Sequence, residues 1–123
     1  MDPNLLQLGF APQPLTPAQY RDLDASGFII LENIIDPQWL AQLRQAFDEI
    51  YDQEGTAAGV EVAQMEGVRR LADLVNKSEV FDAVYVQPQL LMAVYHIIQR
   101  PFKLHSLNGH DPLPDGGLQT LHA

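Results

Sequence analysis

The 123-residue sequence predicts an α+β fold in which helices dominate the first hundred residues. Two segments join a helix cap to a proline in the first helical turn and to apolar residues at helical spacing. Two other segments are apolar or alternate between apolar and polar residues, which is typical of strands. A hydrophobic content of 46% is ordinary for a globular protein and allows a core.

The first helix is predicted to begin at Thr16. Residues 1–15 contain three prolines and little periodicity, so we expect an N-terminal arm, followed over residues 16–123 by one domain at most or by part of a larger one. Thr16 can cap the helix, Pro17 fits its first turn, and Gln19 stands where a capping box places Glu or Gln. Gly27 offers the stop.

A strand and the longest helix are expected next. Residues 28–35 are apolar and rich in β-branched side chains, which predicts a strand. Asp36 and Pro37 then repeat the signal of a cap followed by proline. The helix that follows should end before Gly55 and is predicted to pack through apolar residues at helical spacing, namely Leu40, Leu43, Phe47 and Ile50.

The middle of the chain predicts a loop and short helices. Residues 55–67 are small, acidic and Gly-rich, and residues 67–75 are expected to add a helical turn or two. Ser78 can cap a helix that runs through Val84. Pro88 can start another, which should end at Arg100, because a residue before proline disfavours the helical region.

The last part of the chain predicts two strands around a turn. Residues 102–108 alternate in polarity and are expected to form one strand, and residues 118–122 begin another. The connection over residues 111–117 is rich in proline, glycine and aspartate.

Composition excludes several classes of function. The 16 acidic residues outnumber the 7 basic ones and give a net charge of −9, which argues against a nucleic-acid partner. The absence of cysteine removes disulfides and thiolate sites. There is no signal peptide and no apolar run long enough for a membrane span, so we expect a cytoplasmic protein.

The chain resembles the phytanoyl-CoA dioxygenase family of Fe(II)- and 2-oxoglutarate-dependent oxygenases. The matching pieces are the helix start from Leu15 to Tyr20, the stretch from Asp24 to Asn33 with its Gly-Phe-Ile-Ile core, and the stretch from Asn108 to His122. The resemblance implies an entry helix and first strands that lead into a double-stranded β-helix, which is a cupin-like jelly roll. The expected fold is therefore an incomplete jelly roll.

The resemblance also implies site residues and cofactors. His122 would be a metal ligand for Fe(II), and Asn108 and Gln119 would lie near the cofactor-binding pocket for 2-oxoglutarate. The carboxylate ligand would follow one residue after Ala123, and the second histidine and the arginine for 2-oxoglutarate would come later still. The chain is therefore expected to be truncated at the metal motif and inactive by itself, while its parent would hydroxylate a small-molecule or lipid-like substrate.

The spacing of a His-x-carboxylate motif on a strand suits the binding of iron for physical reasons. A histidine and a carboxylate two residues apart on a strand point to the same side, because side chains alternate. Two histidines and one carboxylate leave positions on the iron for a 2-oxo acid and O₂. A single imidazole provides neither geometry nor selectivity.

Other residues allow simpler interpretations. His105, His110, Asp111 and Asp115 match no zinc spacing, and strand polarity for His105 and turn formation for Asp111 and Asp115 are favoured. His96 is expected to be structural. Arg69 and Arg70 suit either an acidic ligand or, more commonly, surface salt bridges.

Two hypotheses of different class remain open. The first is the oxygenase fragment. The alternative is a non-catalytic helical interaction or support module without metal. In a truncated jelly roll, strands that lack partners would leave open edges, so marginal stability, a strand-edge dimer or aggregation is expected.

Overall fold

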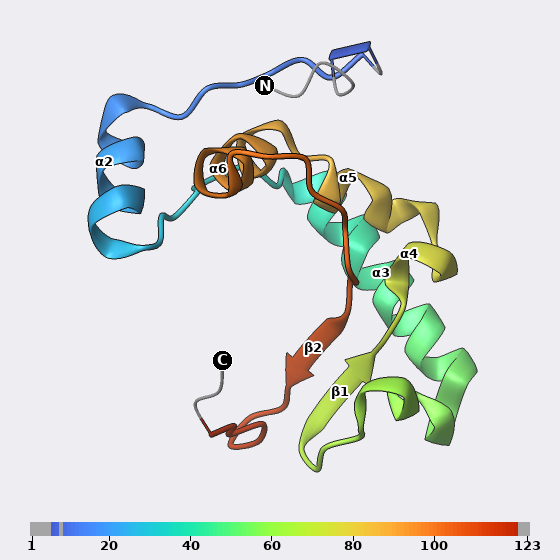
Figure 1. Cartoon of the computed structure of the whole chain (residues 1–123). Helices are drawn as coiled ribbons and strands as arrows, with labels where there is room; N and C mark the ends of the chain where they lie inside the picture. The colour runs from blue at the N-terminus through green and yellow to red at the C-terminus, as the bar shows by residue number, and fades with distance from the viewer. Residues whose placement is uncertain (1–5, 8, 121–123) are drawn as a thin grey trace. The chain divides into compact units, whose positions relative to one another are not determined.

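The computed structural model describes residues 6–7 and 9–120, and this part of the chain is a mixture of helices and sheet (Figure 1). Five α-helices, three short 3₁₀ turns and one two-stranded antiparallel sheet are found there. The predicted α+β class is confirmed at this level. The elements are α2 (Pro17–Ser26), α3 (Pro37–Glu54), η1 (Gly55–Ala57), η2 (Val60–Val62), β1 (Val68–Leu71), α4 (Leu74–Lys77), η3 (Glu79–Phe81), α5 (Asp82–Tyr85), α6 (Pro88–Ile98) and β2 (Gly109–Pro112).

The chain divides into two compact units, each built from two separate stretches. The first unit takes Met1–Asp36 and Ala83–Leu104, and it contains α2 and α6. The second takes Pro37–Asp82 and His105–Ala123, and it contains α3 and the sheet. None of the described helices is long and apolar enough to cross a membrane.

In the first unit, α2 begins and ends as the sequence predicts. The Thr16 side chain accepts a hydrogen bond from the Gln19 N–H at 3.2 Å, and the Thr16 N–H donates to the Gln19 side chain at 2.8 Å. This complete capping box satisfies two backbone donors of the first turn. Gly27 ends the helix in the left-handed conformation with φ of 78°, and its N–H donates to the Leu23 carbonyl.

Helix α6 contacts α2 through His96. Nε2 of His96 lies 2.6 Å from Oδ1 of Asp24, and the ring of Tyr20 lies 4.8 Å from the His96 ring between centroids. This gives His96 a structural contact, as expected. None of the residues of α6 is fully buried, and Ile97 is 58% exposed.

The prediction of a strand over residues 28–35 is wrong. This segment is irregular, with a turn near Asn33, whose φ is 57°. Phe28 and Ile30 are 65% and 72% exposed. An apolar stretch becomes a strand only when another strand pairs with it, and the described part of the chain brings none alongside.

In the second unit, the core lies between α3, the sheet and the turns that follow α3. Leu43, Phe47 and Ile50 pack against the buried side chains of the unit, as predicted, whereas Leu40 is exposed. Spacing of three and four residues places this stripe on one face of the helix. The buried members of the cluster are Ala46, Ala58, Leu71, Leu74 and Phe81.

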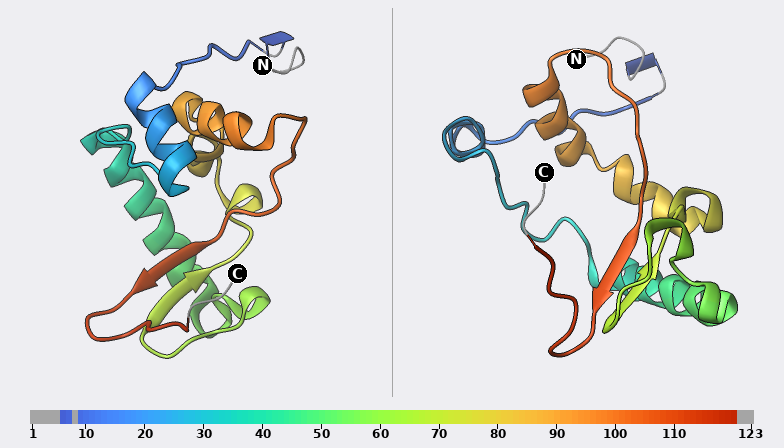
Figure 2. Two further views of the ribbon diagram at one scale, coloured as in Figure 1. Left: turned by 60° about the vertical axis from the view of Figure 1, so that its left-hand side comes forward. Right: turned by 60° about the horizontal axis from the view of Figure 1, so that its bottom comes forward.

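The sheet is antiparallel and lies against α3 (Figure 2). Val68 stands opposite Pro112, and Leu71 stands opposite Gly109. The helical turn predicted for residues 67–75 is wrong over its first part, because these residues form β1 and α4 starts only at Leu74. Val68 and Leu71 at the ends of this strand are buried, and Arg69 and Arg70 between them are half-buried.

The two strands predicted near the C-terminus are also wrong where the structure describes them. Residues 102–108 and 118–120 are irregular, and residues 121–122 lie outside the described part. Strand β2 instead begins at Gly109 and enters the segment predicted as a turn. The ring of Phe47 occupies the place that a Cβ would take at Gly109, so the close approach of β2 to α3 requires glycine there.

Candidate functional site

The predicted metal ligand His122 lies outside the described residues. Within residues 6–7 and 9–120, no group of three or more His, Asp or Glu side chains is placed to hold a metal ion. The described residues therefore do not fit an iron site by themselves.

The two predicted cofactor-binding residues, Asn108 and Gln119, are both exposed. Oδ1 of Asn108 accepts a hydrogen bond from the backbone N–H of Asp73 at 3.2 Å. Asp73 has φ of 53°, and its carboxylate accepts two hydrogen bonds from Nδ2 of Asn76 at 2.8 and 3.0 Å. Asn108 thus supports the bend between β1 and α4, and no described hydrogen bond joins it to Gln119.

Asp111 has a different role from the turn formation predicted for it. It lies on β2 opposite Arg69 and pairs with that arginine. The strand role predicted for His105 is also wrong, because residues 102–108 are not a strand, and its Nδ1 lies 3.2 Å from Oγ of Ser106. His105 and Asp111 are close in the sequence, but they contact different partners and do not form one site.

Arg69 is the centre of a charged and aromatic cluster. Its Nη1 donates to Asp48 at 2.7 Å, and its Nε and Nη2 donate to Asp111 at 2.8 and 2.6 Å. The guanidinium carbon lies 5.3 Å from the ring centroid of Phe47 and 5.5 Å from that of Tyr51. Hydrogen bonds to Asp48 and then to Asp111 raise the pKa of Arg69. The salt-bridge interpretation of this arginine is confirmed.

Lys77 forms a second charged cluster. Its Nζ lies 2.5 Å from Oε1 of Glu54 and 3.3 Å from Oε1 of Glu61. Burial alone would lower the pKa of Lys77, but hydrogen bonds to the two glutamates outweigh it, so the pKa is raised. A backbone hydrogen bond is the main cause that lowers the pKa of Glu61, and Lys77 adds to it.

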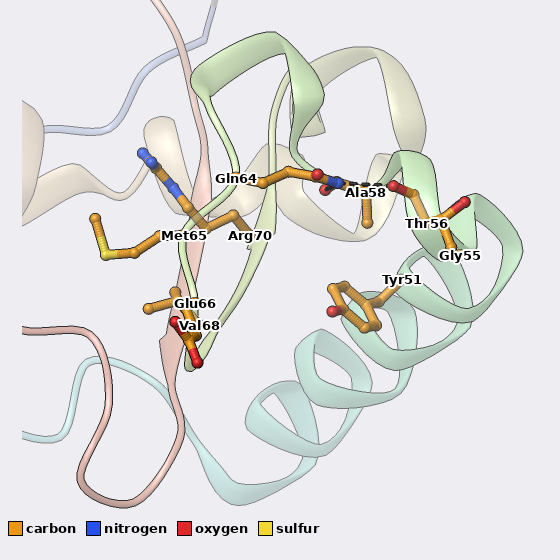
Figure 3. Close-up of a pocket in the computed structure, with 9 residues that line it drawn as sticks. All are labelled: Tyr51, Gly55, Thr56, Ala58, Gln64, Met65, Glu66, Val68 and Arg70. Atoms are coloured by element: carbon orange, nitrogen blue, oxygen red, sulfur yellow. Dashed lines mark hydrogen bonds between the residues drawn. The ribbon is translucent and has the colours of Figure 1, made fainter.

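A cavity of about 450 Å³ lies in the second unit, beside the end of α3 and the turns that follow this helix (Figure 3). Gln64 lies across one side of it, and its Nε2 donates to the carbonyls of Thr56 at 2.7 Å and Ala58 at 2.9 Å. Apart from the basic side chain of Arg70, no pattern in the sequence predicts this cavity. The lining residues are Tyr51, Gly55, Thr56, Ala58, Gln64, Met65, Glu66, Val68 and Arg70.

Comparison with family models, curated proteins and solved structures found no match to this chain.

Proposed function

We propose that this chain is the N-terminal part of an Fe(II)- and 2-oxoglutarate-dependent oxygenase that is similar to the phytanoyl-CoA dioxygenase family. The observation that carries the proposal is the ordered pair of motifs. A capped entry helix leads into Gly27-Phe28-Ile-Ile-Leu, and a Pro/Gly-rich turn after Asn108 leads into Gln119-Thr-Leu-His122. The parent would act on a small-molecule or lipid-like substrate and would complete a jelly-roll fold.

Two local features support this proposal. The capping box of α2 makes the entry helix a defined element at the position that the resemblance requires. The turn after β2 is also defined, since the Leu113 N–H donates to the Gly67 carbonyl at 2.9 Å and the Gly116 N–H donates to the Leu113 carbonyl at 2.9 Å. These bonds fix how the chain turns after β2.

The chemistry itself would belong to the bound iron, which supplies an open site for 2-oxoglutarate and O₂. The part of this chain would be to contribute one neutral imidazole, from His122, to a set of three ligands. The asparagine at position 108 would act indirectly, by holding the bend at Asp73 through its hydrogen bond of 3.2 Å.

The test compares two proteins, the 123-residue chain and the product of the reading frame that contains it. With Fe(II), ascorbate and 2-oxoglutarate, we expect the longer product to release succinate and the 123-residue chain to release none. His122→Ala should abolish the turnover, whereas the matched control His105→Ala should leave it unchanged. Succinate release by the 123-residue chain, lost on His122→Ala, would contradict the fragment proposal. So would a reading frame with no carboxylate two residues after His122.

One observation favours the second candidate, a non-catalytic interaction module. Helix α6 buries none of its residues fully, and four apolar side chains in or just before it are exposed, namely Val86, Leu90, Ile97 and Ile98. A helix that is apolar around most of its surface is normally covered. A full-length reading frame with no metal ligands would favour this candidate over the oxygenase.

A further inference from the structure

Arg70 differs from its basic neighbours in what it contacts. Arg69 and Lys77 each pair with two carboxylates. Arg70 is half-buried, and within the described chain its guanidinium makes one hydrogen bond, from Nη1 to the Ala63 carbonyl at 2.8 Å. A guanidinium carries five N–H donors, so most of those of Arg70 remain available to an anion.

The cavity that Arg70 lines also contains one carboxylate. Glu66 is exposed, and the described residues give it neither a hydrogen bond nor an ion pair. In Figure 3 the charged ends of Arg70 and Glu66 lie apart from each other, and both side chains are on the side of the cavity opposite Tyr51. The lining therefore has one positive and one negative end rather than a single sign.

Apolar side chains also line the cavity. Ala58 and Val68 are buried, and Met65 is half-buried. The Tyr51 hydroxyl is turned toward β1 in Figure 3 and has no hydrogen bond among the described residues. A cavity of about 450 Å³ is within the range of pockets that enclose small ligands, at its lower end.

We propose that this cavity binds a small zwitterion whose carboxylate and ammonium groups stand at opposite ends of an apolar body. The carboxylate meets the free N–H groups of Arg70, and the ammonium group meets Glu66. The methylene body lies against Met65 and Val68. A molecule with only one of the two charges leaves the other lining charge unpaired, which disfavours it. This inference is independent of the oxygenase proposal, because it uses neither His122 nor iron.

The test uses three probes of the same length, which differ only in their end groups. They are 6-aminohexanoate, hexanoate and hexylamine, titrated into the full 123-residue chain while amide chemical shifts are followed. We expect 6-aminohexanoate to shift the amides of Gly55, Met65 and Val68. Hexanoate and hexylamine should each bind about tenfold more weakly, as expected for loss of one charged hydrogen-bonded contact.

Two variants assign the charges. Arg70→Met keeps the aliphatic stem, and Glu66→Gln keeps the shape of an exposed side chain. Each should weaken 6-aminohexanoate by about tenfold. The control Arg44→Met removes an exposed arginine of α3 outside the cavity and should change nothing. The amide spectrum of each variant shows whether it folds. No shift at the cavity amides, equal affinity for all three probes, or unchanged affinity in both variants would overturn the proposal.

Discussion

Arg69 of β1 and Asp111 of β2 stand opposite each other in the sheet, and two nitrogens of the arginine donate to the same carboxylate oxygen. The partner of this arginine on α3, Asp48, binds from the other direction at 2.7 Å. One guanidinium thus ties both strands to the helix. Because Arg69 is about one-third exposed, solvent screens these ion pairs and limits their contribution to stability.

Arg69→Ala should lower the free energy of unfolding by about 1–2 kcal/mol. About half of that comes from the ion pairs and the rest from the lost contact with the two aromatic rings. Urea denaturation, monitored by circular dichroism, measures this change in the free energy of unfolding. Asp111→Asn should cost less, about 0.5 kcal/mol, because Asp48 remains. A value for Arg69→Ala equal to that of the exposed control Arg44→Ala would show that the cluster adds no stability.

The cluster of Lys77, Glu54 and Glu61 should make stability depend on pH at both extremes. The pKa of Lys77 is raised on folding, so its contribution is complete below the unfolded pKa and is lost as pH rises through the folded pKa. The pKa of Glu61 is lowered, so its contribution is present above the unfolded pKa and is lost as pH falls through the folded value.

Lys77→Met is the variant that checks this dependence. Melting temperatures across the pH range should fall less steeply at alkaline pH in the variant than in the parent chain. The acidic side of the profile should also flatten, although Glu61 keeps its backbone hydrogen bond. Parallel profiles for the two proteins would rule out a role for Lys77 in the pH dependence.

Gly109→Ala should destabilise the second unit by about 1–3 kcal/mol, because the added methyl group meets the ring of Phe47. Phe47→Leu removes that obstacle but leaves a cavity. In a double-mutant cycle, the two changes together should cost less than their sum, by about 0.5 kcal/mol or more. Strict additivity would mean that β2 does not approach α3 as closely as the structure shows.

The exposed apolar side chains of the first unit should promote association. Phe28, Ile30 and Leu104 are all exposed. Replacing Phe28 and Ile30 together by serine should reduce the binding of a dye for apolar surfaces, and size-exclusion chromatography with light scattering should show less oligomer. Pairing between copies through the edge of β2 is hindered because Pro112 lacks an N–H. The double serine variant leaves β2 unchanged, so less oligomer in this variant would indicate association through apolar contact and not through strand pairing.

The helices could be predicted because their signals are local. Thr16 and Gln19 are three residues apart and bond to each other, and Pro37 and Pro88 both stand in the first turn of the helices that they were predicted to start. Such contacts are visible in the sequence whatever the rest of the chain does.

The strands could not be predicted, because a strand depends on its partner. Residues 28–35 have the composition of a strand but no strand of the described chain beside them. Strand β2 reads Gly-His-Asp-Pro, which has almost no intrinsic preference for a sheet. The cluster around Arg69 could not be predicted either, because its partners Asp48 and Asp111 lie 21 and 42 positions away in the sequence.

The register of the sheet has a consequence for the order of folding. Its strands are separated by roughly forty residues, and contacts at such separation carry a loop-closure cost that local helices avoid. Residues 58–81 can cover much of the apolar face of α3 soon after the helix is made, whereas the contact between Phe47 and β2 cannot form until Gly109 arrives. Docking of β2 is therefore expected to be the slow step of folding, and the interval before it is when a nascent chain is most exposed to proteases and chaperones.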